Sequence, residues 1–170
     1  MISMSAAWIA LLLFAGGIIY AALNDVMTMT IGNRLVLVLA GAYLILAPAA
    51  GIGPDAILSS VAVAAAVLVS TFVLFAFGWI GGGDAKLAAV AVLWLGPDLA
   101  LPYVLYASVF GAFLTLALLQ YRRMPLPVFL RDLGWPGRAH ATGAGVPYGV
   151  ALALAALLLL PQSHWLVTII

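Results

Sequence analysis

The chain has 170 residues, of which 67% are hydrophobic and 6% are charged, and its formal net charge is +1. Soluble domains carry about 25% charged residues, so this sequence has too few polar side chains to cover a folded surface in water. The composition therefore excludes a soluble fold, the absence of cysteine excludes disulfides and Cys-ligated metal sites, and the small net charge gives no indication of nucleic-acid binding.

Six apolar runs, each bounded by Gly, Pro or charged residues, predict an all-α polytopic membrane protein with six transmembrane helices. Helices are expected because a spanning segment must satisfy its own backbone, and the runs lack the alternation of a barrel. In chain order the predicted spans are Ala6–Asn24, Leu35–Ala50, Ala56–Ile80, Ala85–Leu95, Leu99–Tyr121 and Val146–Leu160. No Lys or Arg precedes the first run, so we interpret it as a retained helix rather than a signal peptide. Residues 1–170 then form a single membrane-embedded domain.

The basic residues predict how these spans are oriented. They all fall in the first, third and fifth connections, and they are Arg34, then Lys86, then Arg122, Arg123, Arg131 and Arg138. Because positively charged loops stay in the cytoplasm, both termini are expected outside. Trp8, Trp94 and Trp165 then map to the outer interface, where aromatic side chains are enriched.

The fourth predicted span is too short to cross a bilayer unaided. Ala85–Leu95 has 11 residues, about 17 Å of helix, against a hydrocarbon core of about 30 Å. We therefore expect the preceding Gly81-Gly82-Gly83-Asp84 segment to be non-helical and to dip below the headgroups at the cytoplasmic end of helix 4. A carboxylate at that depth is costly, which points to a functional role for Asp84.

Asp25, which ends the first span, is expected at the same membrane face as Asp84. Taken singly, Asp84 fits a helix N-cap and Asp25 fits a polar helix end. Taken together they favour a catalytic pair, because two close carboxylates share a proton. The ionised one then draws a proton from water while the protonated one polarises a carbonyl, which is aspartic protease chemistry without metal or cofactor. The glycines of the Gly81-Gly82-Gly83 segment would let backbone approach a substrate closely.

The other polar residues are interpreted as structural. Asp55 and Asp98 each follow Gly-Pro, a combination typical of helix starts. Lys86 is expected to extend to the headgroups and Asp132 to form a solvated salt bridge in the long inner loop. His140 and His164 are expected in loops, and two histidines are too few for a His-rich metal site, so no metal site is predicted.

Three of these segments resemble motifs of the type IV prepilin peptidases, in particular the small branch of the tight-adherence (Flp) pilus systems. Residues 81–87, GGGDAKL, resemble the GxGD motif of that family. Residues 25–33, DVMTMTIGN, resemble its first aspartate motif, with Gly32 where the family usually has Pro. Residues 146–151, VPYGVA, resemble the start of its last helix, and the order of the motifs matches over nearly the whole chain.

The resemblance implies a membrane aspartic endopeptidase that removes the short basic leader from prepilins at the cytoplasmic face of the bacterial inner membrane. Asp25 and Asp84 correspond to the catalytic pair, and Gly81 and Gly83 to the motif glycines. The implied partners are a prepilin substrate helix and the lipid bilayer, and the sequence carries no signal for an oligomeric state. Larger members also N-methylate the pilin and have a bigger cytoplasmic domain that often binds zinc through paired cysteines. This sequence has no cysteine and no room for that domain, so zinc is not expected, and nothing in it supports methyltransferase activity.

Two other classes of function remain open from the residues alone. A small proton- or ion-conducting protein would use buried acids as a relay, although such a relay favours acids distributed across the bilayer. A non-catalytic scaffold of a pilus or secretion assembly would use both aspartates only as helix caps. Replacement of either aspartate by asparagine would then have little effect.

Overall fold

The computed structural model describes residues 2–124, 137, 139–140 and 145–167, and in this part of the chain every regular element is helical. The α-helices are α1 (Ile2–Thr28), α2 (Asn33–Ala49), α3 (Pro54–Ala76), α4 (Gly82–Leu95), α5 (Ala100–Arg123), α8 (Tyr148–Leu159) and α9 (His164–Val167). Short 3-10 turns at Pro97–Leu99 and Leu160–Gln162 precede α5 and α9. The predicted all-α class is confirmed. The salt bridge predicted for Asp132 lies outside the described residues.

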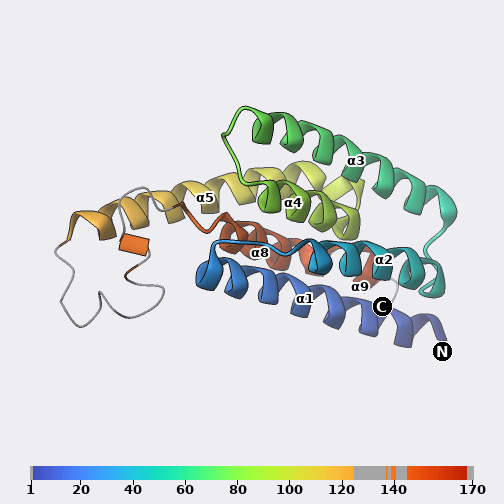
Figure 1. Ribbon diagram of the computed structural model, residues 1–170. Helices are drawn as coiled ribbons and strands as arrows, with labels where there is room; N and C mark the ends of the chain where they lie inside the picture. The colour runs from blue at the N-terminus through green and yellow to red at the C-terminus, as the bar shows by residue number, and fades with distance from the viewer. Residues whose placement is uncertain (1, 125–136, 138, 141–144, 168–170) are drawn as a thin grey trace.

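The helices form one elongated bundle in which α4 and α8 are central (Figure 1). Helix α4 packs against α3, α8 and α2, while α8 packs against α1, α5 and α4. Ten of the eleven residues from Ala85 to Leu95, all but Lys86, are buried in α4. A helix that is apolar on all sides is stable only inside such a bundle.

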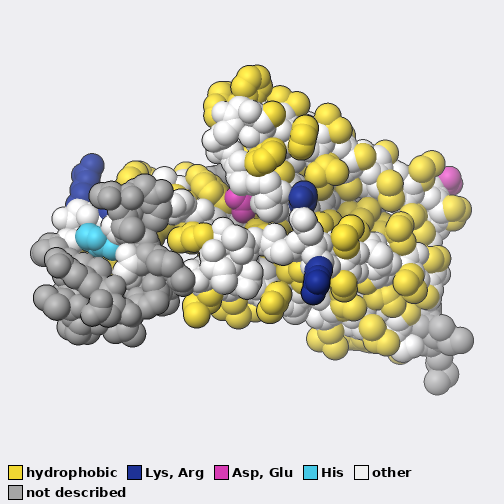
Figure 2. All heavy atoms as spheres, in the orientation of Figure 1, with side chains coloured by type: hydrophobic (Ala, Val, Ile, Leu, Met, Phe, Trp, Pro, Cys, Tyr) yellow, Lys and Arg dark blue, Asp and Glu magenta, His cyan; other side chains and the backbone are white. Residues whose placement is uncertain are grey.

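Four helices are long and apolar enough to span a membrane, namely Met4–Thr28, Pro54–Ala76, Pro97–Arg123 and Tyr148–Leu166. Large apolar side chains are exposed along them, and the face of the molecule in Figure 2 is largely hydrophobic. The protein is therefore a membrane protein. Helix α2, with 17 residues, and α4, with 14, are shorter, so the predicted count of six spans stays a prediction.

Successive long helices alternate in direction, which gathers the basic residues at one end of the bundle (Figure 1). Arg34 lies at the start of α2, Lys86 at the start of α4, and Arg122 and Arg123 at the end of α5. Asp55, in the first turn of α3, and Asp98, before α5, lie at the opposite end. This separation agrees with the structural role expected for the two acids.

Trp94 and Trp165, which we expected at the outer interface, have completely buried side chains, so neither indole faces the headgroups. The indole of Trp94 stacks on Phe14 and on Trp165, with ring centroids 5.0 Å apart in each pair. Its N–H donates to the Leu39 carbonyl at 3.0 Å, and the Trp165 N–H donates to the Trp94 carbonyl at 2.9 Å. These aromatic contacts join α1, α2, α4 and α9.

His164, expected in a loop, begins α9 instead, and its ring fills the space beside Gly96.

Replacement of Trp94 by alanine is expected to destabilise the bundle by about 3–5 kcal/mol, because it leaves a cavity and removes the bond to Leu39. Circular dichroism during thermal or denaturant unfolding in detergent measures the change. Trp79, whose side chain is 74% exposed, gives the matched control, and Trp79→Ala should change stability by less than about 0.5 kcal/mol. Equal effects of the two substitutions would contradict a core role for Trp94.

Candidate active site

Asp25 lies in the last turn of α1 and is one of few buried polar residues in the described part of the chain, with 5% of its surface exposed. The chain turns sharply just beyond it, at Met29, whose φ of 55° lies in the left-handed region. Asn24 closes this turn, since its side-chain amide donates to the Thr30 carbonyl at 2.7 Å. The turn directs the chain back toward α2 and leaves the Asp25 carboxyl facing the bundle interior.

The backbone of α8 holds the Asp25 carboxyl in place. The Gly149 N–H donates to Asp25 Oδ2 at 2.8 Å, across 124 residues of sequence. A Cβ at position 149 would lie 2.8 Å from that oxygen and 3.0 Å from the Asp25 Cβ, closer than side chains normally pack. Position 149 therefore requires glycine. In the sequence Gly149 is only part of a predicted helix start, and no local pattern indicates its contact with Asp25.

The second acid, Asp84, lies in the first turn of α4 and not at the N-cap position that it would fit when taken singly. The N-cap is Gly81, and α4 begins at Gly82, so the predicted non-helical segment ends earlier than expected. The Gly81 backbone donates a hydrogen bond to the Asp84 carboxyl. Asp84 is the third residue of the helix, and its carboxyl accepts this bond from the N-cap residue. The bond satisfies one of the backbone N–H groups that have no partner within the helix at its start.

Two glycines let the segments that carry the acids approach each other. A Cβ on Gly81 would lie 2.7 Å from Asp84 Oδ2, and a Cβ on Gly83 would lie 3.0 Å from the Ile31 Cβ. Ile31 belongs to the turn that follows Asp25, so Gly83 permits close packing between the two motifs. Asp25 and Asp84 line the same pocket of about 260 Å³, together with Thr30, Ile31 and the three glycines.

A side-chain bond also ties the two motifs together. Lys86 Nζ donates to Asn33 Oδ1 at 2.8 Å, which joins the first turn of α4 to the first residue of α2. Lys86 is exposed, as expected for a lysine that extends toward the headgroups. The bond to Asn33 was not anticipated, because these residues are 53 positions apart in the sequence.

The pocket has the composition needed for acid–base chemistry at a peptide bond. Two carboxylates provide one proton donor and one proton acceptor when they share a single proton. Residues from Gly81 to Gly83 and from Met29 to Ile31 line the rest of the pocket beside the two acids. No group of three His, Cys, Asp or Glu side chains able to hold a metal ion occurs within the described ranges.

The structure thus brings Asp25, Asp84, Gly81 and Gly83 together, as the sequence predicted, and keeps Asp55 and Asp98 at the other end of the bundle. His140, expected in a loop, is helical, and its Nε2 lies 2.8 Å from the Met124 carbonyl, close to the end of α5 and not in this pocket.

Comparison with known protein families identifies the family of the chain's central part. A sequence model described as the type IV leader peptidase family matches residues 12–116, well over half of the chain, and the matched segment contains both Asp25 and Asp84. No curated protein and no solved structure matches the chain.

Proposed function

Since the chain belongs to the type IV leader peptidase family, we propose that it is an aspartic endopeptidase that cleaves the short basic leader from Flp-type prepilins. The observation that carries this proposal is the single pocket shared by Asp25 and Asp84, two acids 59 positions apart in a chain with only five. The proposed enzyme uses no metal or cofactor and transfers no methyl group.

In the proposed mechanism one of the two carboxylates is ionised and takes a proton from a water molecule in the pocket. The water oxygen attacks the carbonyl carbon of the scissile peptide, while the protonated carboxyl donates a hydrogen bond to the carbonyl oxygen. The carbon–nitrogen bond then breaks, and the departing amine takes up a proton from a carboxyl group. Gly149, through its N–H at Asp25, and Gly81, through its backbone at Asp84, hold the carboxylates in position.

The length of α5 supports a site below the membrane surface. A Cβ on Gly111 would touch Tyr148 and Ala151 of α8, so the middle of α5 lies level with the start of α8 and with Asp25. From Gly111 to Arg123, α5 continues for about 18 Å (Figure 1). Exposed apolar side chains, including Phe113, Leu116 and Leu119, cover this stretch before the first charged residue, Arg122.

The prepilin substrate suits this placement. It resembles an apolar helix in the bilayer with a basic leader on the cytoplasmic side, so its scissile bond lies near the cytoplasmic face. We propose that both termini of the enzyme lie outside and that the end of the bundle with Arg34, Lys86 and Arg122 faces the cytoplasm of a bacterial inner membrane.

The purified protein, reconstituted in lipid vesicles with a synthetic Flp-type prepilin, is expected to release the leader and the mature pilin as two products by mass spectrometry. Excess EDTA should leave the rate unchanged, because the two carboxylates need no metal. An uncleaved prepilin would contradict the proposed function. If the same vesicles then showed pH-dependent ion flux, the result would favour the alternative that the chain is a proton- or ion-conducting protein. Loss of cleavage on chelation would contradict the two-carboxylate mechanism.

A further inference from the structure

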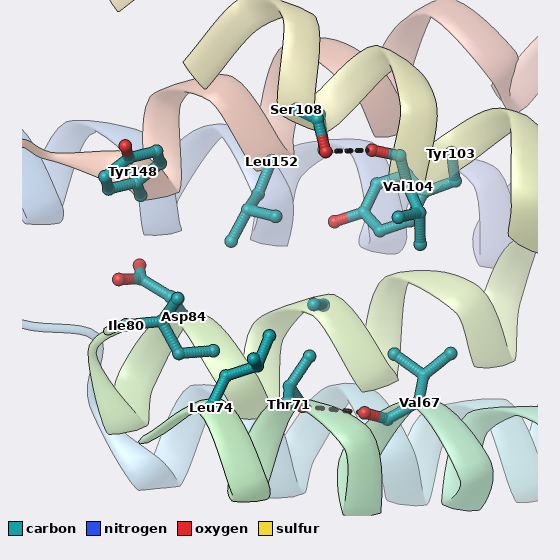
Figure 3. Close-up of a pocket in the computed structure, with 12 residues that line it drawn as sticks. Val67, Thr71, Leu74, Ile80, Asp84, Tyr103, Val104, Ser108, Tyr148 and Leu152 are labelled. Atoms are coloured by element: carbon teal, nitrogen blue, oxygen red, sulfur yellow. Dashed lines mark hydrogen bonds between the residues drawn. The ribbon is translucent and has the colours of Figure 1, made fainter. Parts of the chain in front are cut away.

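A second pocket, of about 210 Å³, continues from Asp84 into the interior of the bundle (Figure 3). Helices α3, α4, α5 and α8 all contribute to its walls, through side chains that include Thr71, Ala88, Ala107 and Leu152. Its lining is almost wholly apolar, whereas the pocket shared by the two acids is richer in polar groups. Asp84 lines both pockets, so they meet at the candidate catalytic carboxyl.

The apolar pocket contains a polar group that lacks a partner. The Tyr103 side chain is completely buried, and its hydroxyl makes no hydrogen bond to any residue that the structure describes. In Figure 3 the hydroxyl points into the pocket, whereas the Ser108 and Thr71 hydroxyls donate to carbonyls of their own helices. A buried hydroxyl without a partner is costly, so its presence here indicates an acceptor that arrives from outside the chain.

A peptidase that acts inside a membrane must supply hydrogen bonds to its substrate. The scissile segment has to leave the helical conformation before water can reach the carbonyl carbon. Its carbonyl oxygens then lose their helical donors, and no lipid group replaces them. An apolar pocket with one free hydroxyl donor meets both needs of such a segment, namely burial of apolar side chains and a partner for a carbonyl.

We propose that this pocket binds the apolar residues that directly follow the scissile bond, and that the Tyr103 hydroxyl donates a hydrogen bond to one of their backbone carbonyls. The inference rests on the proposed function. The pocket extends from Asp84 past Ala107 toward Tyr103, that is, from the basic end of the bundle toward its other end. A prepilin with its leader at the basic end therefore places its leader at the glycines and its apolar segment in this pocket.

Replacement of Tyr103 by phenylalanine removes only the hydroxyl and tests this role. The KM for a Flp-type prepilin should rise roughly tenfold with kcat unchanged, because the bond is made equally in the bound substrate and the transition state. Thermal stability should not fall, since an unpaired buried hydroxyl is lost. Tyr106→Phe is the matched control, because Tyr106 lies one turn along α5, 43% exposed, and should leave KM unaltered.

A second substitution tests the shape of the pocket. Ala107→Leu places extra volume inside it, and the control Ala112→Leu places the same volume on an exposed position of α5. Ala107→Leu should lower kcat/KM at least about tenfold for a prepilin with a large apolar residue after the scissile bond. For a prepilin with alanine there the loss should be much smaller.

These results separate the pocket assignment from the proposed function. If the wild-type protein cleaves no prepilin, the proposed function itself fails. If the wild type and both controls cleave normally while Tyr103→Phe and Ala107→Leu match them on every prepilin, only the pocket assignment is overturned.

Discussion

Asp25→Asn and Asp84→Asn are each expected to lower the rate of leader cleavage by about a thousandfold or more. Asparagine preserves the size of the side chain and its ability to accept the backbone bonds from Gly149 and Gly81, but it can neither take nor give a proton at neutral pH. General acid–base catalysis contributes about 10²–10⁴-fold, and loss of either partner removes it. The loss is measured by comparing the initial rate of product formation of each variant with that of the wild type, in vesicles and by mass spectrometry.

The controls for these variants lie at the other end of the bundle. Asp55→Asn and Asp98→Asn make the same chemical change in the first turns of two other elements, and both should cleave at the wild-type rate. Circular dichroism should show the same helix content and unfolding temperature, within a few degrees, for all four variants. Cleavage by Asp25→Asn or Asp84→Asn at more than about a tenth of the wild-type rate would contradict the catalytic pair and would indicate that the acids act only as helix caps.

Gly149→Ala is expected to reduce cleavage by about a hundredfold although no ionisable group is changed. Its Cβ would lie 2.8 Å from Asp25 Oδ2 and 3.0 Å from the Asp25 Cβ, so the carboxyl must move away from its place. A displacement of about 1 Å at a catalytic group is enough for a loss of this size. The loss should appear mainly in kcat, since the apolar pocket does not include position 149.

Gly145→Ala is the matched control, because a Cβ at that position meets no atom within 4 Å and the Gly145 carbonyl can still accept its bond from Arg122. It should cleave at close to the wild-type rate. Wild-type activity in Gly149→Ala would contradict the role assigned to the contact between α8 and Asp25.

The helices were predictable because each is a long apolar run with clear stops. The observed α2 and α5 differ from the predicted spans by no more than two residues at either end. The start of α4 was harder to predict. Consecutive glycines disfavour helix, yet Gly82 and Gly83 are helical, because the packing of Gly83 on Ile31 outweighs their intrinsic preference.

The site was predictable as far as its two acids and the glycines before Asp84. Asp25 and Asp84 stand out because charged residues are rare in this sequence, and costly wherever they are buried. Gly149 and Tyr103 are not charged, and their importance arises from contacts across α1, α4, α5 and α8 that no local pattern encodes. The burial of Trp94 and Trp165 was not predictable for a related reason, since an indole suits the membrane interface and a bundle core equally well.

The central claim is that Asp25 and Asp84 act as one catalytic unit on a prepilin. The most direct test compares the residual cleavage rates of Asp25→Asn, Asp84→Asn and the double variant over long incubations in the same vesicles. Because a shared proton needs both carboxylates, the double variant should be no slower than either single variant. A double variant slowed by the product of the two single effects would show two independent contributions, and would contradict the account.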